Sequence, residues 1–202
     1  MYSSRFIDYS EIGIDTEIVD FGYNIERGCV VLFEDDTCVG DSNNKWVGIF
    51  EKGVTDYKKC EFYLDDTFLI IANGKGYICG CKNKIHSQLG SYYYTDSIIN
   101  AQNILLSSFT NIDIYSQYKL VKSIQIDDID GIRFLEKNND FIRGEFRQIS
   151  STDFNEWLPF YIDMNTIEFN CDKNRMWIET SFIDGKTEYK YLTMDLKQKQ
   201  TT

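Results

Sequence analysis

Histidine is nearly absent from this sequence, which has only His86 among its 202 residues. A zinc site or a Ser-His-Asp triad built on imidazole would therefore depend on a single side chain. The sequence also lacks a phosphate-binding Walker loop, a G-x-G-x-x-G dinucleotide motif and a G-x-S-x-G nucleophile elbow. We therefore predict no catalytic residue, no cofactor and no metal site, and expect a protein that is not an enzyme.

Long apolar segments are missing as well. The longest unbroken apolar run, residues 68–72, is far too short to cross a bilayer. Residues 1–8 contain no apolar stretch of the kind found in secretory signals. These two absences predict a cytoplasmic protein that does not bind a membrane.

Basic residues are outnumbered, with 21 lysines and arginines against 32 aspartates and glutamates, for a formal net charge of -11. Nucleic-acid binding requires a basic face to neutralise phosphates, so we expect no nucleic-acid partner. An acidic surface instead favours a basic protein partner, because opposite charges speed association and form complementary contacts.

Proline is equally scarce, and other turn motifs separate runs of strand character. Asn73-Gly74 lies between Thr67–Ala72 and residues 75–81, which is the strongest short-range signal for a β-hairpin. Asp184-Gly185 predicts a second hairpin, and Asn138-Asn139 a third in which both asparagines adopt positive φ.

These motifs predict an all-β fold, with one domain over residues 1–194 and a polar tail at 195–202. We expect about ten to fourteen mostly antiparallel strands, arranged as a sandwich, a curled sheet or a partial propeller. The best helix candidate is residues 96–106, where Asp96 can cap the first turn and apolar residues recur at helical spacing.

The cysteines lie mostly in apolar runs, so we expect reduced, buried thiols. Cys79 and Cys81 would place both sulfurs on one face of a strand, close in sequence to His86. A structural zinc site needs a fourth ligand at recognisable spacing, and the sequence offers only the distant Cys171. We favour a buried thiol pair over a metal site.

The acidic residues gather in short turn clusters. Residues 32–37 and 62–67 align at an offset of 30, which indicates either a duplicated β-meander or, as we favour, shared turn chemistry. A third cluster, residues 127–131, has the acidic character of an EF-hand calcium loop but does not match its pattern. Ile126 and Lys137 would occupy the first and last ligand positions, which require oxygen ligands. The residues that we expect to contact a partner are Asp127, Asp128, Asp130, Asp35, Asp36, Asp65 and Asp66.

The segment from Asp130-Gly131-Ile132 to a Trp-x-Pro-Phe-x-x-Asp stretch at residues 157–163 resembles the closing segment of small β-rich bacterial proteins. In overall character, the chain is similar to immunity proteins of bacterial polymorphic or contact-dependent growth inhibition toxin systems. That resemblance implies a cytoplasmic protein that binds a cognate toxin domain, often a basic nuclease, and blocks it without catalysis. It supplies no active-site residues.

Two alternatives stay open. A carbohydrate-active or carbohydrate-binding β-module would use exposed aromatic side chains, for which Trp46 and residues 92–94 are candidates, and an enzyme would add two facing carboxylates in a cleft. A component of a larger assembly would expose unpaired strand edges. An immunity protein should instead present a broad acidic face.

Overall fold

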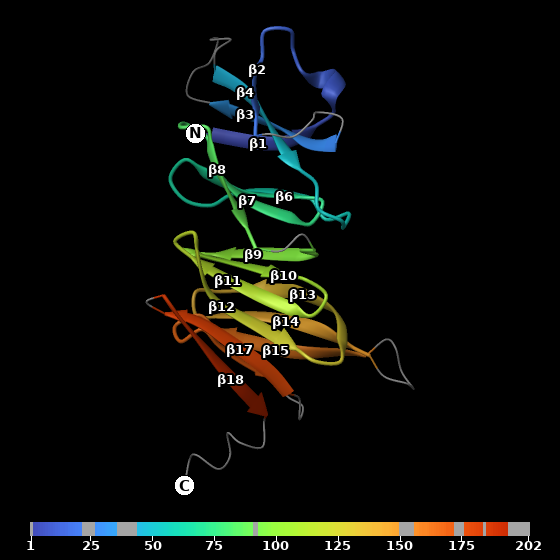
Figure 1. Ribbon diagram of the computed structural model, residues 1–202, viewed down its shortest axis with the longest axis vertical. Coiled ribbons are helices and arrows are strands. Elements are labelled where there is room, and N and C mark those ends of the chain that lie inside the picture. The colour runs from blue at the N-terminus through green and yellow to red at the C-terminus, as the bar shows by residue number, and fades with distance from the viewer. Residues whose placement is uncertain are drawn as a thin grey trace. The chain divides into compact units, whose positions relative to one another are not determined.

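The computed structural model describes residues 2–21, 27–35, 44–90, 93–149, 156–171, 176–183 and 185–193. Within these residues the chain forms eighteen strands and one 3-10 turn, η1 (Tyr9–Glu11), which confirms the all-β class (Figure 1). The strands outnumber those expected from the turn motifs, because several are only four or five residues long. No helix in these ranges has the length and apolar character that a membrane span requires.

The chain divides into two compact units, Met1–Tyr94 and Thr95–Thr202. Each unit contains two sheets that share one hydrophobic core. That residues 1–194 form a single cooperative domain stays a prediction, for which an experiment is described below. The predicted tail at 195–202 lies outside the described residues.

The first unit pairs a mixed sheet with an antiparallel meander. Its sheets have the strand orders β1-β3-β4-β2 and β5-β6-β7-β8, and only the β2–β4 pair is parallel among the described strands. Phe33 and Phe50 from one sheet share a core with Ile70 and Tyr77 from the other. The strands are β1 (Tyr2–Ile7), β2 (Glu17–Asp20), β3 (Gly28–Asp35), β4 (Lys45–Glu51), β5 (Lys59–Phe62), β6 (Thr67–Ala72), β7 (Lys75–Gly80) and β8 (Ile85–Leu89).

The second unit is built in the same way from a six-stranded and a four-stranded sheet. Their orders are β18-β17-β12-β11-β10-β9 and β13-β14-β15-β16. Ile114 and Trp177 from the first pack in one core with Phe146 and Phe160 from the second. The strands are β9 (Asp96–Asn100), β10 (Asn103–Ser107), β11 (Asn111–Ser116), β12 (Lys119–Ile126), β13 (Ile129–Lys137), β14 (Phe141–Gln148), β15 (Trp157–Asp163), β16 (Glu168–Cys171), β17 (Met176–Ile183) and β18 (Lys186–Thr193).

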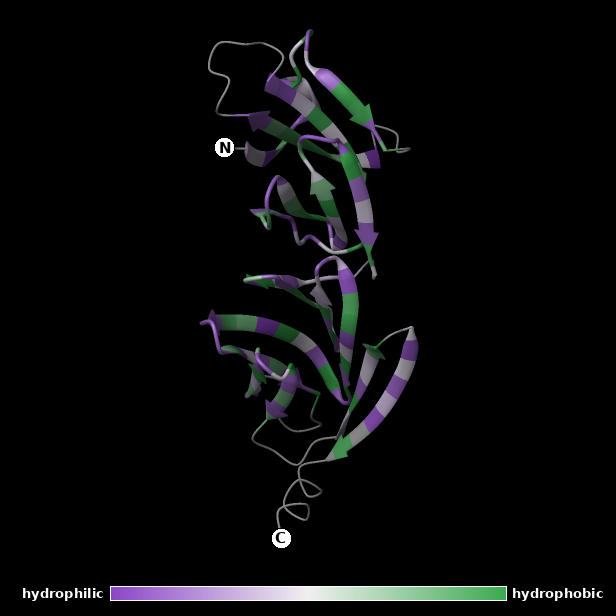
Figure 2. Ribbon diagram, turned by 90° about the vertical axis from the view of Figure 1, so that its left-hand side faces the viewer, coloured by the Kyte–Doolittle hydropathy of each residue, from purple (hydrophilic) through white to green (hydrophobic). Residues whose placement is uncertain are grey.

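Side chains alternate between the core and the outside along the strands of these sheets. In β14, Ile142 and Phe146 are buried, whereas Arg143, Glu145 and Arg147 between and after them are only partly buried. Figure 2 shows the same alternation as purple and green bands along individual strands. This period of two is the local property that makes a half-buried strand, and it leaves a polar face on the outside of β14.

All three predicted hairpins are present, and two of them have the predicted kind of turn. β6 and β7 are joined through Asn73 and Gly74, whose φ values of 52° and 89° both lie in the left-handed region. β17 and β18 pair with Ile183 opposite Lys186, across a turn in which Gly185 has φ of 75°. Asparagine and glycine tolerate positive φ better than other residues, which explains why these turns could be found in the sequence.

The third predicted hairpin is also present, since β13 and β14 pair antiparallel, but the conformation of its turn was predicted wrongly. Neither Asn138 nor Asn139 has a positive φ. Instead, the Asn138 Oδ1 atom accepts hydrogen bonds from the backbone N–H groups of Asp140 and Phe141, both at 2.8 Å. The connection is therefore an Asx turn in a three-residue loop, because the asparagine side chain replaces the backbone carbonyl that a two-residue turn would use.

The helix expected at residues 96–106 is also wrong. Asp96–Asn100 and Asn103–Ser107 form the antiparallel hairpin β9–β10, with Ala101 at φ 51° in its turn. The β-branched Ile98, Ile99 and Ile104 lose side-chain freedom in a helix and pack well in a sheet. The long-range pairing of β10 with β11 then decides the strand conformation.

The open edge of β13 is covered by side chains from the six-stranded sheet. Asp96 Oδ2 accepts a hydrogen bond from the Phe134 N–H at 2.7 Å, and Ser107 Oγ donates to the Ile132 carbonyl at 3.3 Å. These bonds satisfy backbone groups that would otherwise invite pairing with another strand. A chain with one proline thus protects this edge with polar side chains.

Candidate binding surface

Two of the predicted acidic clusters come together in the first unit, around Tyr2. Tyr2 in β1 lies opposite Asp35 at the end of β3, and its hydroxyl donates a hydrogen bond to the Asp35 carboxylate. Burial and then the Asp35 charge raise the pKa of Tyr2, and Asp66 adds a further negative charge. We name Tyr2, Asp35 and Asp66 the Tyr2 patch. It brings acidic residues from two distant turns to one tyrosine.

The turn between β5 and β6 positions the second of these clusters. Asp65 has φ of 52° and is exposed, whereas Asp66 is half-buried and its carbonyl accepts a hydrogen bond from the Cys81 N–H at 2.8 Å. Asp36, which was also predicted to bind a partner, lies outside the described residues. Asp35 and Asp66, one from each of the two aligned segments, therefore both act electrostatically on Tyr2, with the larger effect from Asp35.

The third cluster belongs to the second unit, and the structure splits it. Asp127 and Asp128 form the turn between β12 and β13, where Asp128 is exposed at φ 57° and its carbonyl accepts a hydrogen bond from the Ile149 N–H. Asp130 instead binds Arg147, with Nε and Nη2 donating to its two carboxylate oxygens at 2.7 and 3.1 Å. Asp128 is exposed and Asp127 is partly exposed, whereas the Asp130 carboxylate is paired with an arginine.

Arg147 is part of a network that sequence reasoning missed. The guanidinium carbon of Arg133 lies 4.1 Å from the Trp157 ring centroid, and that of Arg147 lies 5.8 Å from it. Arg133 also donates to Glu145 Oε2 from Nε at 3.1 Å and from Nη2 at 2.7 Å. The sequence of β14 contained a sign of this network, because Arg143, Glu145 and Arg147 alternate with core residues. The same alternation is equally typical of an ordinary solvent-exposed strand face.

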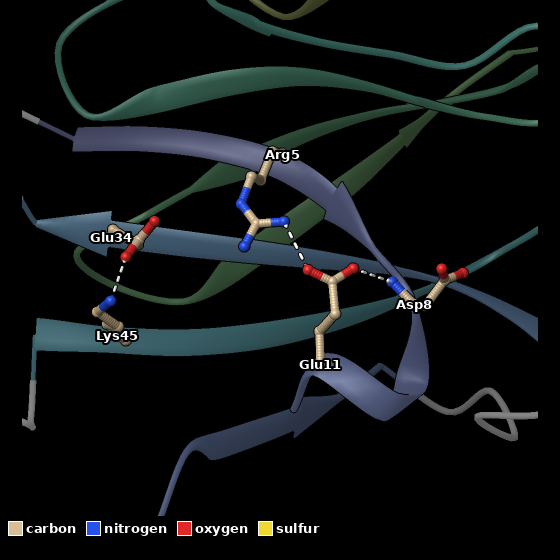
Figure 3. A network of polar contacts seen from close by, with 5 residues as sticks. All are labelled: Arg5, Asp8, Glu11, Glu34 and Lys45. Atoms are coloured by element: carbon tan, nitrogen blue, oxygen red, sulfur yellow. Dashed lines mark hydrogen bonds and ion pairs between the residues drawn. The ribbon is translucent and has the colours of Figure 1, made fainter. Parts of the chain in front are cut away.

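Nearer the N-terminus, exposed basic residues are also paired with carboxylates. Arg5 Nη1 lies 3.0 Å from Glu11 Oε2, and the Asp8 N–H donates to Glu11 Oε1 at 2.8 Å (Figure 3). The Asp8 N–H and then Arg5 lower the pKa of Glu11. Glu34 and Lys45 link β3 to β4 in the same view. Such exposed pairs contribute little stability. They do neutralise the positive charges of Arg5 and Lys45 near β1, the strand that carries Tyr2.

The described cysteines and the histidine are not grouped into a metal site. Cys79 and Cys81 are buried in the first core, and burial raises the pKa of Cys79 to about 12. The His86 ring centroid lies 4.1 Å from that of Phe21 and 5.7 Å from that of Tyr77. Burial, followed by the charge of Lys75, lowers the pKa of His86. Among the described residues, no three His, Cys, Asp or Glu side chains are grouped to hold a metal ion.

The aromatic residues considered for carbohydrate stacking are placed differently from one another. Trp46 and Tyr94 are 4% and 1% exposed, whereas Tyr93 is 51% exposed, and Tyr92 lies outside the described residues. Trp46 stacks on Phe33 with ring centroids 4.2 Å apart, so it fills the core. Trp157, by contrast, lies opposite Arg147 and occupies an outward-facing position of β15.

The chain matches no model of a known protein family and no curated protein sequence. The functional argument therefore depends on the chemistry of these surfaces. The Tyr2 patch concentrates negative charge around one aromatic ring, and the Arg–Trp network presents an ordered aromatic side chain. Both arrangements suit binding to another protein, because interfaces are enriched in tyrosine, tryptophan and arginine.

Proposed function

We propose that this protein binds and occludes a basic protein domain, in the manner of a cytoplasmic immunity protein that neutralises a cognate toxin. The observation that carries the proposal is the Tyr2 patch, in which Asp35 and Asp66 converge on Tyr2 in a chain of net charge -11. A basic partner would be attracted over a distance by the whole chain and held locally by these carboxylates. No chemical step is required.

Tyr2 gives the patch an anchor as well as charge. Its ring is half-buried against the first core, and its hydroxyl is oriented by Asp35. A tyrosine that is already ordered loses little conformational entropy on binding. A lysine or arginine of the partner could then contact the carboxylates and the ring together, which combines an ion pair with a cation–π contact.

The test is co-expression with the product of the open reading frame immediately upstream. We expect a stable complex with a basic, toxin-like domain, and the dissociation constant should rise with salt concentration because the contact is electrostatic. The proposal is wrong if the neighbouring gene encodes no such domain and no basic protein co-purifies.

Paired variants locate the interface. Replacing Asp35 and Asp66 with asparagine should weaken the complex by about tenfold or more, since two charge-assisted contacts are lost. The matched control replaces two exposed acids of the second unit, Asp140→Asn with Glu188→Gln, and makes the net charge less negative by the same amount. Asp127→Asn with Asp128→Asn forms a third arm. Equal weakening in all three would show that only net charge matters.

A further inference from the structure

The outer face of the sheet β13-β14-β15-β16 carries arginine and aromatic side chains together. The register places Arg147 opposite Trp157 and Arg143 opposite Tyr161 on β14 and β15, and Arg133 of β13 opposite Glu145. All of these positions alternate with core residues, so their side chains share the face turned away from the core. We name this set the Arg–Trp face: Arg133, Arg143, Arg147, Trp157, Pro159 and Tyr161.

Trp157 is held in place before any partner arrives. Arg133 and Arg147 lie over its ring, and each guanidinium is fixed by a carboxylate, from Glu145 and Asp130 respectively. The end of the indole lies close to Gly131, where a Cβ atom would be in ordinary contact with Trp157 Cη2 at 3.5 Å. An aromatic side chain ordered in this way binds with little further loss of entropy, and two more apolar residues, Pro159 and Tyr161, continue the strip along β15.

Arg143 differs from the other two arginines, because no carboxylate of the described residues is paired with it. Its Nε atom is buried and makes no hydrogen bond within the described part of the chain. Glu145, the nearest acid along β14, binds Arg133, and Glu136 lies opposite Arg143 in the ladder without forming an ion pair with it. Because no carboxylate of the described residues neutralises this guanidinium, a carboxylate supplied by a partner would form a charge-assisted contact with it.

We propose that the Arg–Trp face is a docking surface for a protein partner that brings a carboxylate to Arg143 and an apolar side chain onto Trp157, Pro159 and Tyr161. A polyanion such as a nucleic acid does not fit, because Glu136, Asp163 and Glu168 lie on the same face and would repel successive phosphates. A single carboxylate avoids that repulsion. This inference does not depend on the proposed function, which concerns the other unit.

The test uses the full-length, isotope-labelled protein and two blocked dipeptides, acetyl-Leu-Asp-amide and acetyl-Leu-Asn-amide. Titration to millimolar concentrations, observed through the Arg143 Nε–H signal, should shift that signal with the Asp peptide. The Asn peptide should bind about tenfold more weakly, because a charge-assisted hydrogen bond is replaced by a neutral one. No shift with either peptide, or equal affinity for both, would overturn the proposal.

Two variants and one further probe complete the test. Arg143→Gln should abolish the preference for aspartate, and Arg143→Lys should keep part of it, because lysine retains the charge but not the planar fork. The control Arg5→Gln removes an exposed arginine of the first unit and should change nothing. Tighter binding of a single-stranded oligonucleotide than of the Asp peptide would contradict the choice of a protein partner.

Discussion

At the scale of single residues, the side chains that looked most reactive in the sequence are used for packing. His86 lies against aromatic rings, and the described cysteines are free thiols. Burial raises the pKa of Cys60 to about 12, as it does for Cys79, so these thiols are protonated and poorly nucleophilic at neutral pH. The histidine and these two cysteines therefore have a structural role in the first unit.

The lowered pKa of His86 predicts how stability depends on pH. In the unfolded chain the imidazole titrates near 6.5, and in the folded protein it titrates below that value. The unfolded state therefore binds the proton more readily, so this group's contribution to the free energy of unfolding is full above pH 6.5 and is lost as the pH falls below it. NMR of the single imidazole should give the folded pKa directly.

Urea unfolding on either side of pH 6.5 provides the matching thermodynamic test. The decrease of stability in that window should be smaller in a His86→Gln variant, which cannot take up the proton. An unchanged pH slope in the variant would mean that carboxylates, rather than His86, cause the decrease.

At the scale of elements, each sheet packs closely enough that a single methyl group matters. Gly144 in β14 lies below the Phe160 ring, and a Cβ atom there would overlap that ring and come within 2.6 Å of the Arg133 carbonyl oxygen. Gly131 in β13 is the matched case, because its nearest neighbour would be 3.5 Å away, an ordinary contact. Within this sheet, Gly144 should not tolerate an added methyl group, whereas Gly131 should.

We expect Gly144→Ala to lower the free energy of unfolding by about 1–3 kcal/mol, since the backbone of β13 must move to relieve the overlap. Gly131→Ala should change it by less than about 1 kcal/mol. Urea titrations of both variants measure the difference. Equal stability of the two proteins would show that β13 and β14 adjust freely.

An ion pair between Lys122 and Glu179 connects β12 to β17, and Lys122 also contacts the turn after β15. Lys122 Nζ lies 3.1 Å from Glu179 Oε2 and donates to the Ile167 carbonyl at 2.6 Å. Glu179 is only 6% exposed, and its other oxygen accepts a hydrogen bond from Trp177 Nε1. A buried pair with its oxygens satisfied fixes the pairing of strands that are 57 residues apart in the sequence.

At the scale of the whole molecule, each unit has its own core, and the excess negative charge is shared by turns of both. The single-domain prediction requires that the two cores unfold together. Native-state hydrogen exchange tests it: the slowest amides of β6 and of β11 should then exchange with the same free energy, equal to that of global unfolding. Separate free energies for the two strands would show that the units are two domains.

Local patterns in the sequence determined the all-β class, the three predicted hairpins and the kind of turn in two of them. Alternation of apolar and polar residues depends only on neighbours along the chain, and Asn73-Gly74 adopts its turn because those residues tolerate positive φ. The wrong helix prediction also came from a local pattern. Residues 96–106 offered a helix cap and helical spacing, but pairing of β10 with β11, which no local pattern encodes, made them a hairpin.

The acidic excess and the identity of the acidic turns were likewise properties of the sequence alone. Only the tertiary structure decided which carboxylates are available. It brought Asp35 and Asp66 to Tyr2, and it bound Asp130 to Arg147 beside Trp157. The physical reason is that charge contacts depend on strand order and register, which are set by long-range pairing and by the packing of two sheets over each core.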